Sequence, residues 1–255
     1  MKVASPVIIR PFPEWENSVR AGFSTREGGF STGAYSQLNL GFRSGDDPVT
    51  VRKNWNTVLD ATGLSEKPLV MPNLVHGDAL VDADAYIVEV DGLIKVKEAD
   101  AVFCRSRDRI LTVTMADCLT ALIFDPGQRT VAAVHAGWRG TQLGILEKTL
   151  RSLAEKGYIE PANTWVAFGP CLRPASLEVG EEVAAQLNSN FVIRNGGKIY
   201  FDMPACNRSQ ALQGGILPNH LRDMGGDTFP EATRYFSYRR DGQASGRLAA
   251  FISLI

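Results

Sequence analysis

The stretch VAAVHAGWRG, residues 131 to 140, constrains the fold more than any other part of the sequence. Val131 to Val134 form a short apolar run bounded by turn residues, which predicts a buried strand with His135 at its end. Gly137 and Gly140 indicate a tight turn, and the following TQLGILEKTLRSL has leucines at helical spacing. A glycine turn between strand and helix aims backbone N–H groups above the strand, which favours an anion. We therefore expect a functional site here.

Composition limits the domain count and the classes of partner. The 255 residues are 44% hydrophobic and 22% charged, which is typical of a globular protein, and no linker-like tract divides them. We therefore expect a single catalytic domain over residues 1–255. The 27 basic and 28 acidic residues nearly cancel, so we expect neither a nucleic-acid nor a membrane partner. The absence of a signal-peptide core or a long apolar run predicts a cytoplasmic location.

The four cysteines are too widely spaced to form a CxxC pair, so we expect no disulfide framework. Cys104, Cys171 and Cys206 are interpreted as small buried residues. Cys118 has another interpretation, which depends on the hairpin that follows it.

Glycine and proline divide the rest of the chain into short elements. Asp47 followed by Pro48 predicts a capped helix start, and Gly63 predicts the end of that helix. Further helices are expected over 178–190 and 203–216, and a C-terminal hairpin is expected with 234–240 and 246–255 as its arms. Strands are expected over 68–75, 100–104, 109–114, 119–124, 130–135, 164–168 and 198–202. Neighbouring strands without intervening helices favour a mixed α/β fold with helices covering mixed sheets.

The segment LTALIFDPGQRTVAAVH predicts that a thiol lies beside an imidazole. If Asp125 pairs with Gln128 across a two-residue turn, the same register places Cys118 opposite His135. Directly opposed residues have Cβ atoms about 4.5 to 5.5 Å apart on one face, a separation that two ligands of one metal can use. A three-residue loop would instead place Cys118 opposite Ala136.

A third candidate ligand is His76, because NLVHGDAL also places a histidine and a glycine after an apolar run. Two histidines and a cysteine supply three protein ligands, which is the number found in a catalytic zinc site with an open fourth position. Copper is the alternative, since two histidines and a cysteine are also the blue-copper set. Met115 is the only local thioether for such a site.

The same residues allow an interpretation without a metal. Cys118 would be a nucleophile and His135 its general base, with a third group needed to orient the histidine. The turn from Gly137 to Gly140 would then supply amides for an oxyanion hole. Asp117, next to the cysteine, is a candidate to orient a water or to carry a proton.

Four segments together carry a family resemblance: ADAVFCRSRDRILTVTMADC, VAAVHAGWRG, AFGPC and YFSYRRDGQASGR. The chain resembles the polyphenol-oxidase-like, or peptidoglycan-editing-factor, family from about residue 21 to its last residue. The resemblance implies two mixed β-sheet layers flanked by helices, in a fold distantly related to cysteine-dependent toxin deamidases. It also implies one zinc ion, held at the positions of His76, Cys118 and His135.

The family is associated with phosphorolysis of adenosine, inosine and methylthioadenosine, and with adenosine deamination. Small-molecule substrates, a purine nucleoside and phosphate, are therefore expected. Arg139, at the start of a helix, is the first candidate for phosphate, and Arg26 and Arg43 are further anion candidates. Asn39 is a candidate to hydrogen-bond the sugar or base. Asp117 is the candidate proton carrier for a deamination.

Three alternatives remain open from the sequence. The first is a copper-dependent polyphenol oxidase, the activity behind the older laccase name of the family. The second is a Cys–His amidase or deamidase that acts on peptidoglycan precursors. The third is a zinc-stabilised binding module without catalytic activity.

Overall fold

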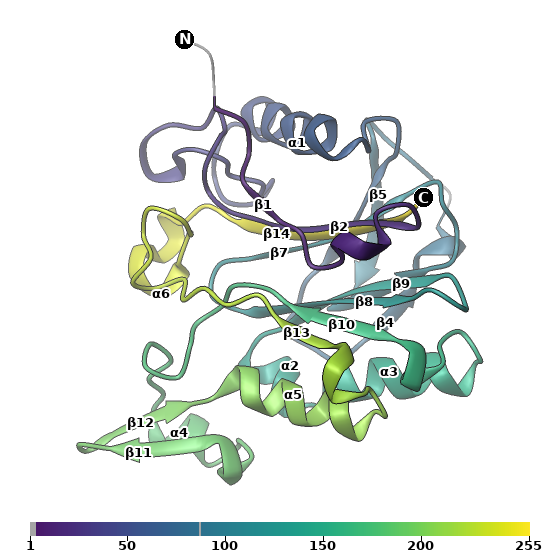
Figure 1. Ribbon diagram of the computed structural model, residues 1–255. Helices are drawn as coiled ribbons and strands as arrows, with labels where there is room; N and C mark the ends of the chain where they lie inside the picture. The colour runs from purple at the N-terminus through teal and green to yellow at the C-terminus, as the bar shows by residue number, and fades with distance from the viewer. Residues whose placement is uncertain (1–3, 87) are drawn as a thin grey trace.

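The computed structural model describes residues 4–86 and 88–255, so residues 1–3 and 87 of the expected domain lie outside the described part. Two six-stranded sheets pack face to face between layers of helices (Figure 1). The order of the first sheet is β1 (Ile8–Ile9), β2 (Val19–Ser24), β14 (Leu248–Leu254), β7 (Ile110–Met115), β3 (Leu69–Asn73) and β5 (Leu93–Glu98). The second sheet has the order β13 (Leu221–Asp223), β10 (Trp165–Phe168), β8 (Leu119–Asp125), β9 (Thr130–Ala136), β6 (Ala101–Cys104) and β4 (Leu80–Asp82).

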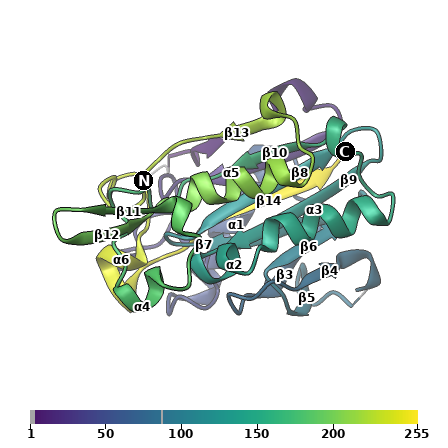
Figure 2. The same ribbon diagram turned by 90° about the horizontal axis from the view of Figure 1, so that it is seen from below.

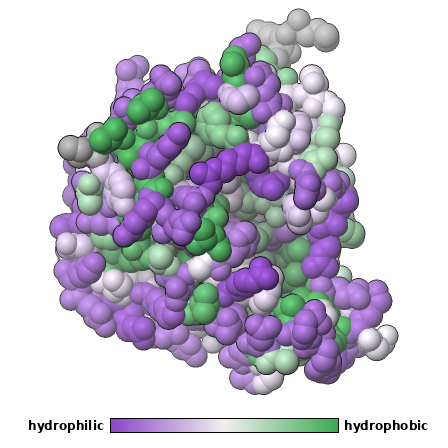
Figure 3. Space-filling model, turned by 180° about the vertical axis from the view of Figure 1, so that it is seen from behind, coloured by the Kyte–Doolittle hydropathy of each residue, from purple (hydrophilic) through white to green (hydrophobic). Residues whose placement is uncertain are grey.

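Both sheets mix parallel and antiparallel neighbours, which confirms the expected mixed α/β fold. In the first sheet β3 runs parallel to β5 and β7, and in the second β10 runs parallel to β13 and β4 to β6. A separate hairpin of β11 (Val192–Asn195) and β12 (Lys198–Phe201) projects from one corner of the molecule (Figure 1). The face seen in Figure 3 carries small hydrophobic groups among hydrophilic residues rather than one broad apolar area.

Helices cover the outer face of each sheet, and a core lies between the sheets. The α-helices are α1 (Pro48–Thr62), α2 (Trp138–Gln142), α3 (Ile145–Glu155), α4 (Glu181–Ala184), α5 (Met203–Gln213) and α6 (Tyr238–Asp241). Short 3-10 turns occupy Pro13–Trp15, Gly33–Tyr35, Ala83–Ala85, Pro161–Asn163, Ser189–Phe191, Pro218–His220 and Gly242–Ala244. Figure 2 shows α3 and α5 lying across the second sheet, and α1 covers the first. No described helix is long and apolar enough to cross a membrane.

Helix α1 begins and ends where the sequence predicts. The Asp47 side chain accepts hydrogen bonds from the backbone N–H groups of the first turn, and Pro48 occupies the first helical position. Gly63 ends the helix with a φ of 69°, a left-handed conformation that favours glycine. The buried face of α1 carries Trp55, whose indole N–H donates to the Leu40 carbonyl at 3.0 Å. Burying one such large side chain contributes roughly 1.5 to 3 kcal/mol.

The predicted helix after the glycine turn forms as two helices. Leu143 and Gly144 separate α2 from α3, and Gly144 has a φ of 76°. The expected helix over 178–190 is reduced to α4, whereas the one over 203–216 forms as α5.

The predicted C-terminal hairpin is wrong. Residues 234–240 do not form a strand: Ser237 accepts a hydrogen bond from the Arg240 N–H and caps the short helix α6. Strand β14 instead pairs with β2 on one side and β7 on the other, in the middle of the first sheet. Local turn residues suggested a partner strand nearby in the sequence. All residues of β14 are buried, however, and a fully buried strand needs a hydrogen-bonding partner strand on both of its edges.

The register expected for the β8–β9 hairpin is also wrong. Asp125 pairs with Thr130 rather than with Gln128, so residues 126–129 form a four-residue loop. Arg129 in this loop has a φ of 52°. His135 therefore lies opposite Thr120, not opposite Cys118. The register differs by two positions, and because side chains alternate with a period of two, Cys118 still points to the same face as His135.

Candidate metal centre

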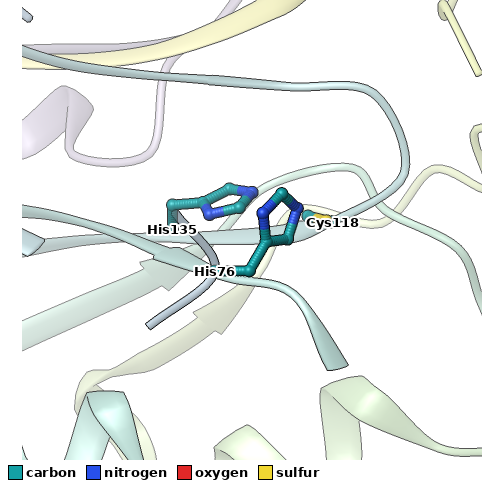
Figure 4. A group of neighbouring side chains, drawn as sticks. All are labelled: His76, Cys118 and His135. Atoms are coloured by element: carbon teal, nitrogen blue, oxygen red, sulfur yellow. The ribbon is translucent and has the colours of Figure 1, made fainter. Parts of the chain in front are cut away.

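Three side chains from separate segments meet at one end of the second sheet. His135 lies near the end of β9, Cys118 directly precedes β8, and His76 follows β3 in a loop. Their ligand atoms all lie within 4.8 Å of one another. The two imidazole rings meet edge to face, with centroids 5.0 Å apart (Figure 4). The structure thus brings together the three residues that the sequence singled out.

The loop geometry lets these side chains approach closely. His76 has a φ of 60°, which turns the chain sharply after β3. Gly137 is required by the packing, since a Cβ atom there would lie 2.9 Å from the Cys118 sulfur and 3.2 Å from Cδ2 of His76. The first glycine of the HAGWRG motif therefore makes room for the centre.

A buried aspartate that the sequence analysis did not single out holds two of these residues in place. One oxygen of Asp100 accepts the Nδ1–H of His135 at 2.8 Å and the backbone N–H of His76 at 3.0 Å. The other oxygen accepts the N–H groups of Val75 at 3.1 Å and Gly77 at 2.8 Å. The Asp100 side chain is fully buried. An ionised residue directly before the apolar strand AVFC was the available sequence signal, because a charge there requires partners.

The charges of the centre stabilise one another. Burial raises the pKa of the Cys118 thiol, but the charge of His135 and the hydrogen-bonding imidazoles lower it further, so the net pKa falls. Burial lowers the pKa of His135, yet the Cys118 thiolate and the Asp100 carboxylate raise it overall. Burial also opposes ionisation of Asp100, and its bonds to His135 and the loop amides hold its pKa below the usual range. The centre therefore favours a thiolate, which is the nucleophilic and metal-binding form.

The donor set fits a metal ion. Tetrahedral zinc with bonds of about 2.0 to 2.3 Å places its ligand atoms roughly 3.3 to 3.7 Å apart, which a small side-chain adjustment would achieve here. Because the Asp100 carboxylate takes the Nδ1–H of His135, the Nε2 lone pair is left for a metal. Two imidazoles and a thiolate suit zinc and also suit copper.

The centre opens into a cavity of about 680 Å³. His76 is exposed and Cys118 partly exposed, whereas His135 is buried, so the centre is reached from the His76 side. Of the residues that the structure describes, the cavity is lined by apolar side chains, by the aromatic Phe42, Trp138 and Tyr238, and by the cationic Arg43, Lys95, Arg239 and Arg247. Sequence reasoning assigned no role to Lys95, Arg239 or Arg247. Arg239 and Arg247 lie in YFSYRRDGQASGR, one of the segments that carry the family resemblance, but the local pattern did not show that this segment lines the cavity.

The predicted catalytic residues lie in different surroundings. Asp117 lines the cavity, but its carboxylate accepts hydrogen bonds from the Thr228 hydroxyl at 2.7 Å and the backbone N–H of Arg239 at 2.5 Å. Arg139 is exposed on α2, with its guanidinium carbon 4.5 Å from the centroid of the Trp138 ring, and does not line the cavity.

Of the other predicted binding residues, only Arg43 reaches the cavity, where it donates to the side chain of Asn73. The Arg26 guanidinium donates to the carbonyls of Ser36 and Ala232 and lies over the Phe236 ring. Asn39 is fully buried, and its side-chain amide donates to the Ser44 hydroxyl and accepts the backbone N–H of Gly41 within one loop.

Fold and site together define a mixed α/β protein with a His–Cys–His group that can hold a metal ion beside a large cavity. Residues 20–255 match a family model described as "Multi-copper polyphenol oxidoreductase laccase". The chain is 36% identical to purine nucleoside phosphorylase YfiH of Shigella flexneri, over 95% of this chain and 98% of that one. It is 34% identical to a purine nucleoside phosphorylase of Deinococcus radiodurans, over 93% and 90%.

Solved structures resemble the chain over nearly its whole length. A Neisseria meningitidis protein superposes with a TM-score of 0.84 at 31% identity, over 98% of this chain and 99% of that one. YlmD of Geobacillus stearothermophilus gives 0.85 at 26% identity, over 95% and 93%. The chain belongs to the laccase-like YfiH family, whose curated members named above are purine nucleoside phosphorylases.

Proposed function

We propose that residues 1–255 act as one catalytic domain, a zinc-containing enzyme that cleaves purine nucleosides with phosphate. Adenosine, inosine and methylthioadenosine are the proposed substrates, with a free base and a ribose 1-phosphate as products. The observation that carries the proposal is the placement of the His–Cys–His group in the wall of a cavity that also carries aromatic and cationic side chains. The names of the curated relatives support the same reaction class.

In this reaction a phosphate oxygen bonds to C1′ of the ribose while the bond from C1′ to the purine nitrogen breaks. The electron pair leaves with the purine, which takes up one proton. A bound zinc ion would act as a Lewis acid that stabilises developing negative charge. The aromatic residues Trp138 and Tyr238 offer faces for the purine, and the cavity cations attract the phosphate.

Adenosine deamination is proposed as a second activity of the same cavity. Water would add at C6 of adenine, and ammonia would leave to give inosine. Asp117 is the proposed proton carrier, since its carboxylate lies in the cavity wall next to the cysteine. Its hydrogen bonds from Thr228 and Arg239 hold the carboxylate in one orientation.

One observation favours a second candidate, the Cys–His amidase or deamidase. The third group that such a mechanism needs is present, because Asp100 accepts the Nδ1–H of His135 and orients the imidazole toward Cys118. The lowered pKa of Cys118 favours the attacking thiolate. The same geometry therefore serves a metal ligand set or a catalytic triad, and metal content separates the two.

The test combines metal analysis with nucleoside assays. Purified wild type and the variants Cys118→Ala and His135→Ala would be compared for bound zinc and copper by mass spectrometry. We expect about one zinc per chain in the wild type and loss of zinc in both variants. Purine release should require phosphate and should fall with zinc content.

Other results would support one of the alternative functions. Bound copper with oxygen consumption on phenols would identify a polyphenol oxidase. Amide hydrolysis that survives chelation but is lost in Cys118→Ala would identify the triad. A zinc-loaded wild type that neither cleaves nor deaminates nucleosides would refute the proposal and leave a binding module.

A further inference from the structure

Among the described residues four cations line the cavity, and Arg247 differs from the other three in its burial. Arg43 donates to Asn73, and Arg239 donates from Nη1 to the Glu178 carbonyl at 2.9 Å. Lys95 is exposed to solvent. None of the four forms an ion pair with a described carboxylate, but Arg247 is half-buried whereas the other three are exposed.

The Arg247 side chain is held in place by the residues around it. Nη1 donates to the carbonyls of Ser245 at 2.7 Å and Gly246 at 3.0 Å. Its aliphatic stem packs on Gly41, where an added Cβ would lie 2.6 Å from Cγ of the arginine. Nε and Nη2 have no acceptor among the described residues. The guanidinium is thus fixed on one side and offers two parallel N–H directions on the other.

A second link fixes the backbone of the same residue. Asn39 is fully buried, and its side-chain oxygen accepts the N–H of Arg247 at 2.8 Å and that of Gly41 at 3.0 Å. Backbone bonding continues from the Leu40 N–H to the Arg247 carbonyl at 2.9 Å. Asn39 therefore joins the loop that carries Arg43 to the start of β14.

The positive charge of Arg247 is only partly compensated by its surroundings. Burial lowers the pKa of its guanidinium, although the Cys118 thiolate and the Asp117 carboxylate lie close enough to raise it in part. A cation removed from water costs free energy unless an anion or several hydrogen bonds offset the loss. A cavity ligand with two adjacent anionic oxygens would supply both.

We propose that Arg247 is the phosphate-binding residue of this cavity, that its Nε–H and Nη2–H groups form a bidentate contact with one phosphate group, and that Asn39 positions it. The proposal rests on the phosphorolysis proposed above and moves the phosphate contact from the exposed Arg139 to the cavity. Planar two-point contacts of this kind are the reason arginine is favoured over lysine for phosphate. Arg43 and Lys95 add positive charge at the same cavity.

The experiment measures equilibrium binding of inorganic phosphate by calorimetry, without nucleoside. Arg247→Met keeps the apolar stem and removes the charge, and Arg247→Lys keeps the charge and removes the fork. We expect Arg247→Met to weaken phosphate binding by about 10- to 100-fold, the effect of losing charged hydrogen bonds. The phosphate affinity of Arg247→Lys should lie between that of Arg247→Met and that of the wild type. Arg151→Met on the exposed face of α3 is the matched control and should bind phosphate as the wild type does.

Zinc content and thermal midpoint are recorded for every variant, so that a folding defect is recognised. Adenosine 5′-monophosphate as a second probe separates free phosphate from phosphate carried on a nucleoside. Its binding should weaken in Arg247→Met if the residue receives either source.

The outcomes separate the two proposals. Binding of phosphate that depends on Arg247 without any base release supports the anion site and refutes phosphorolysis. Phosphate-dependent base release with an unchanged KM for phosphate in Arg247→Met overturns the assignment of Arg247 and leaves phosphorolysis standing. Equal binding of both probes by wild type and folded Arg247→Met also overturns it.

Discussion

Replacing Asp100 by asparagine tests whether one buried carboxylate organises the whole centre. Asparagine has almost the same shape but only one acceptor oxygen, and its amide nitrogen can only donate. Each carboxylate oxygen of Asp100 receives two donors, so two of the four contacts must become donor facing donor. If the amide nitrogen faces His135, that imidazole must carry its proton on Nε2 and loses the lone pair needed for a metal.

The magnitude follows from this count. A buried donor left without an acceptor costs about 1 to 3 kcal/mol, and removing one partner of a buried charged pair costs about 3 to 5 kcal/mol. We therefore expect Asp100→Asn to lower the free energy of unfolding by about 3 to 5 kcal/mol. Residues that orient a metal-bound histidine contribute about 10- to 100-fold in metal affinity, so we expect a zinc affinity reduced by that factor.

The assay is a zinc competition against a chromophoric chelator, together with urea unfolding in the presence and absence of zinc. Asp78→Asn is the matched control, because Asp78 is partly exposed and pairs with Lys148 at the surface. The control should change neither quantity by more than a few tenths of a kcal/mol. Native zinc affinity in Asp100→Asn, at native stability, would show that the carboxylate does not position the ligands.

Three further variants test other contacts. Gly137→Ala should reduce zinc loading with little change in the circular dichroism of the fold, because the new Cβ would lie 2.9 Å from the Cys118 sulfur; full zinc loading would refute this steric argument. Asp47→Ala should lower the urea midpoint through loss of the α1 cap, and Asp47→Ser should restore much of it. Burial opposes ionisation of Asp223, but Arg173 lowers its pKa overall, so its stabilising contribution is lost as pH falls below about 4. In Asp223→Asn, acid unfolding scans should show a shallower loss of stability over that pH range than the wild type shows. An unchanged pH dependence of stability would contradict this role of Asp223.

The relation between Cys118 and His135 shows how far local sequence can predict a site. The predicted register was wrong by two positions, because a four-residue loop ending in a left-handed Arg129 replaces the expected two-residue turn. Alternation along a strand repeats every two residues, so the error left both side chains on one face. The prediction of their proximity held because it depended on parity more than on the exact partner.

Long-range arrangement was beyond the same reasoning. Asp100 was missed because its partners come from loop residues 75 to 77 and from strand β9, which are brought together only by the packed fold. The cavity cations were missed for the same reason. Arg239 and Arg247 lie within the two arms that were predicted to form a C-terminal hairpin, so the error there also removed the context that places them beside the cavity.

The central position of β14 has a consequence for how the chain acquires its structure during synthesis. Phe23 in β2 pairs with Ala250, more than 220 residues later in the chain, and β14 also bonds to β7 on its other side. Until residues 248–254 emerge, β2 and β7 each present an unpaired edge of the first sheet, and such edges are sites of aggregation. The second sheet can pair β8 with β9 as soon as both are made, because they are joined by a short loop. We therefore expect the nascent protein to carry a nearly formed second sheet and an open first sheet, and to need protection from other chains until its last strand is inserted.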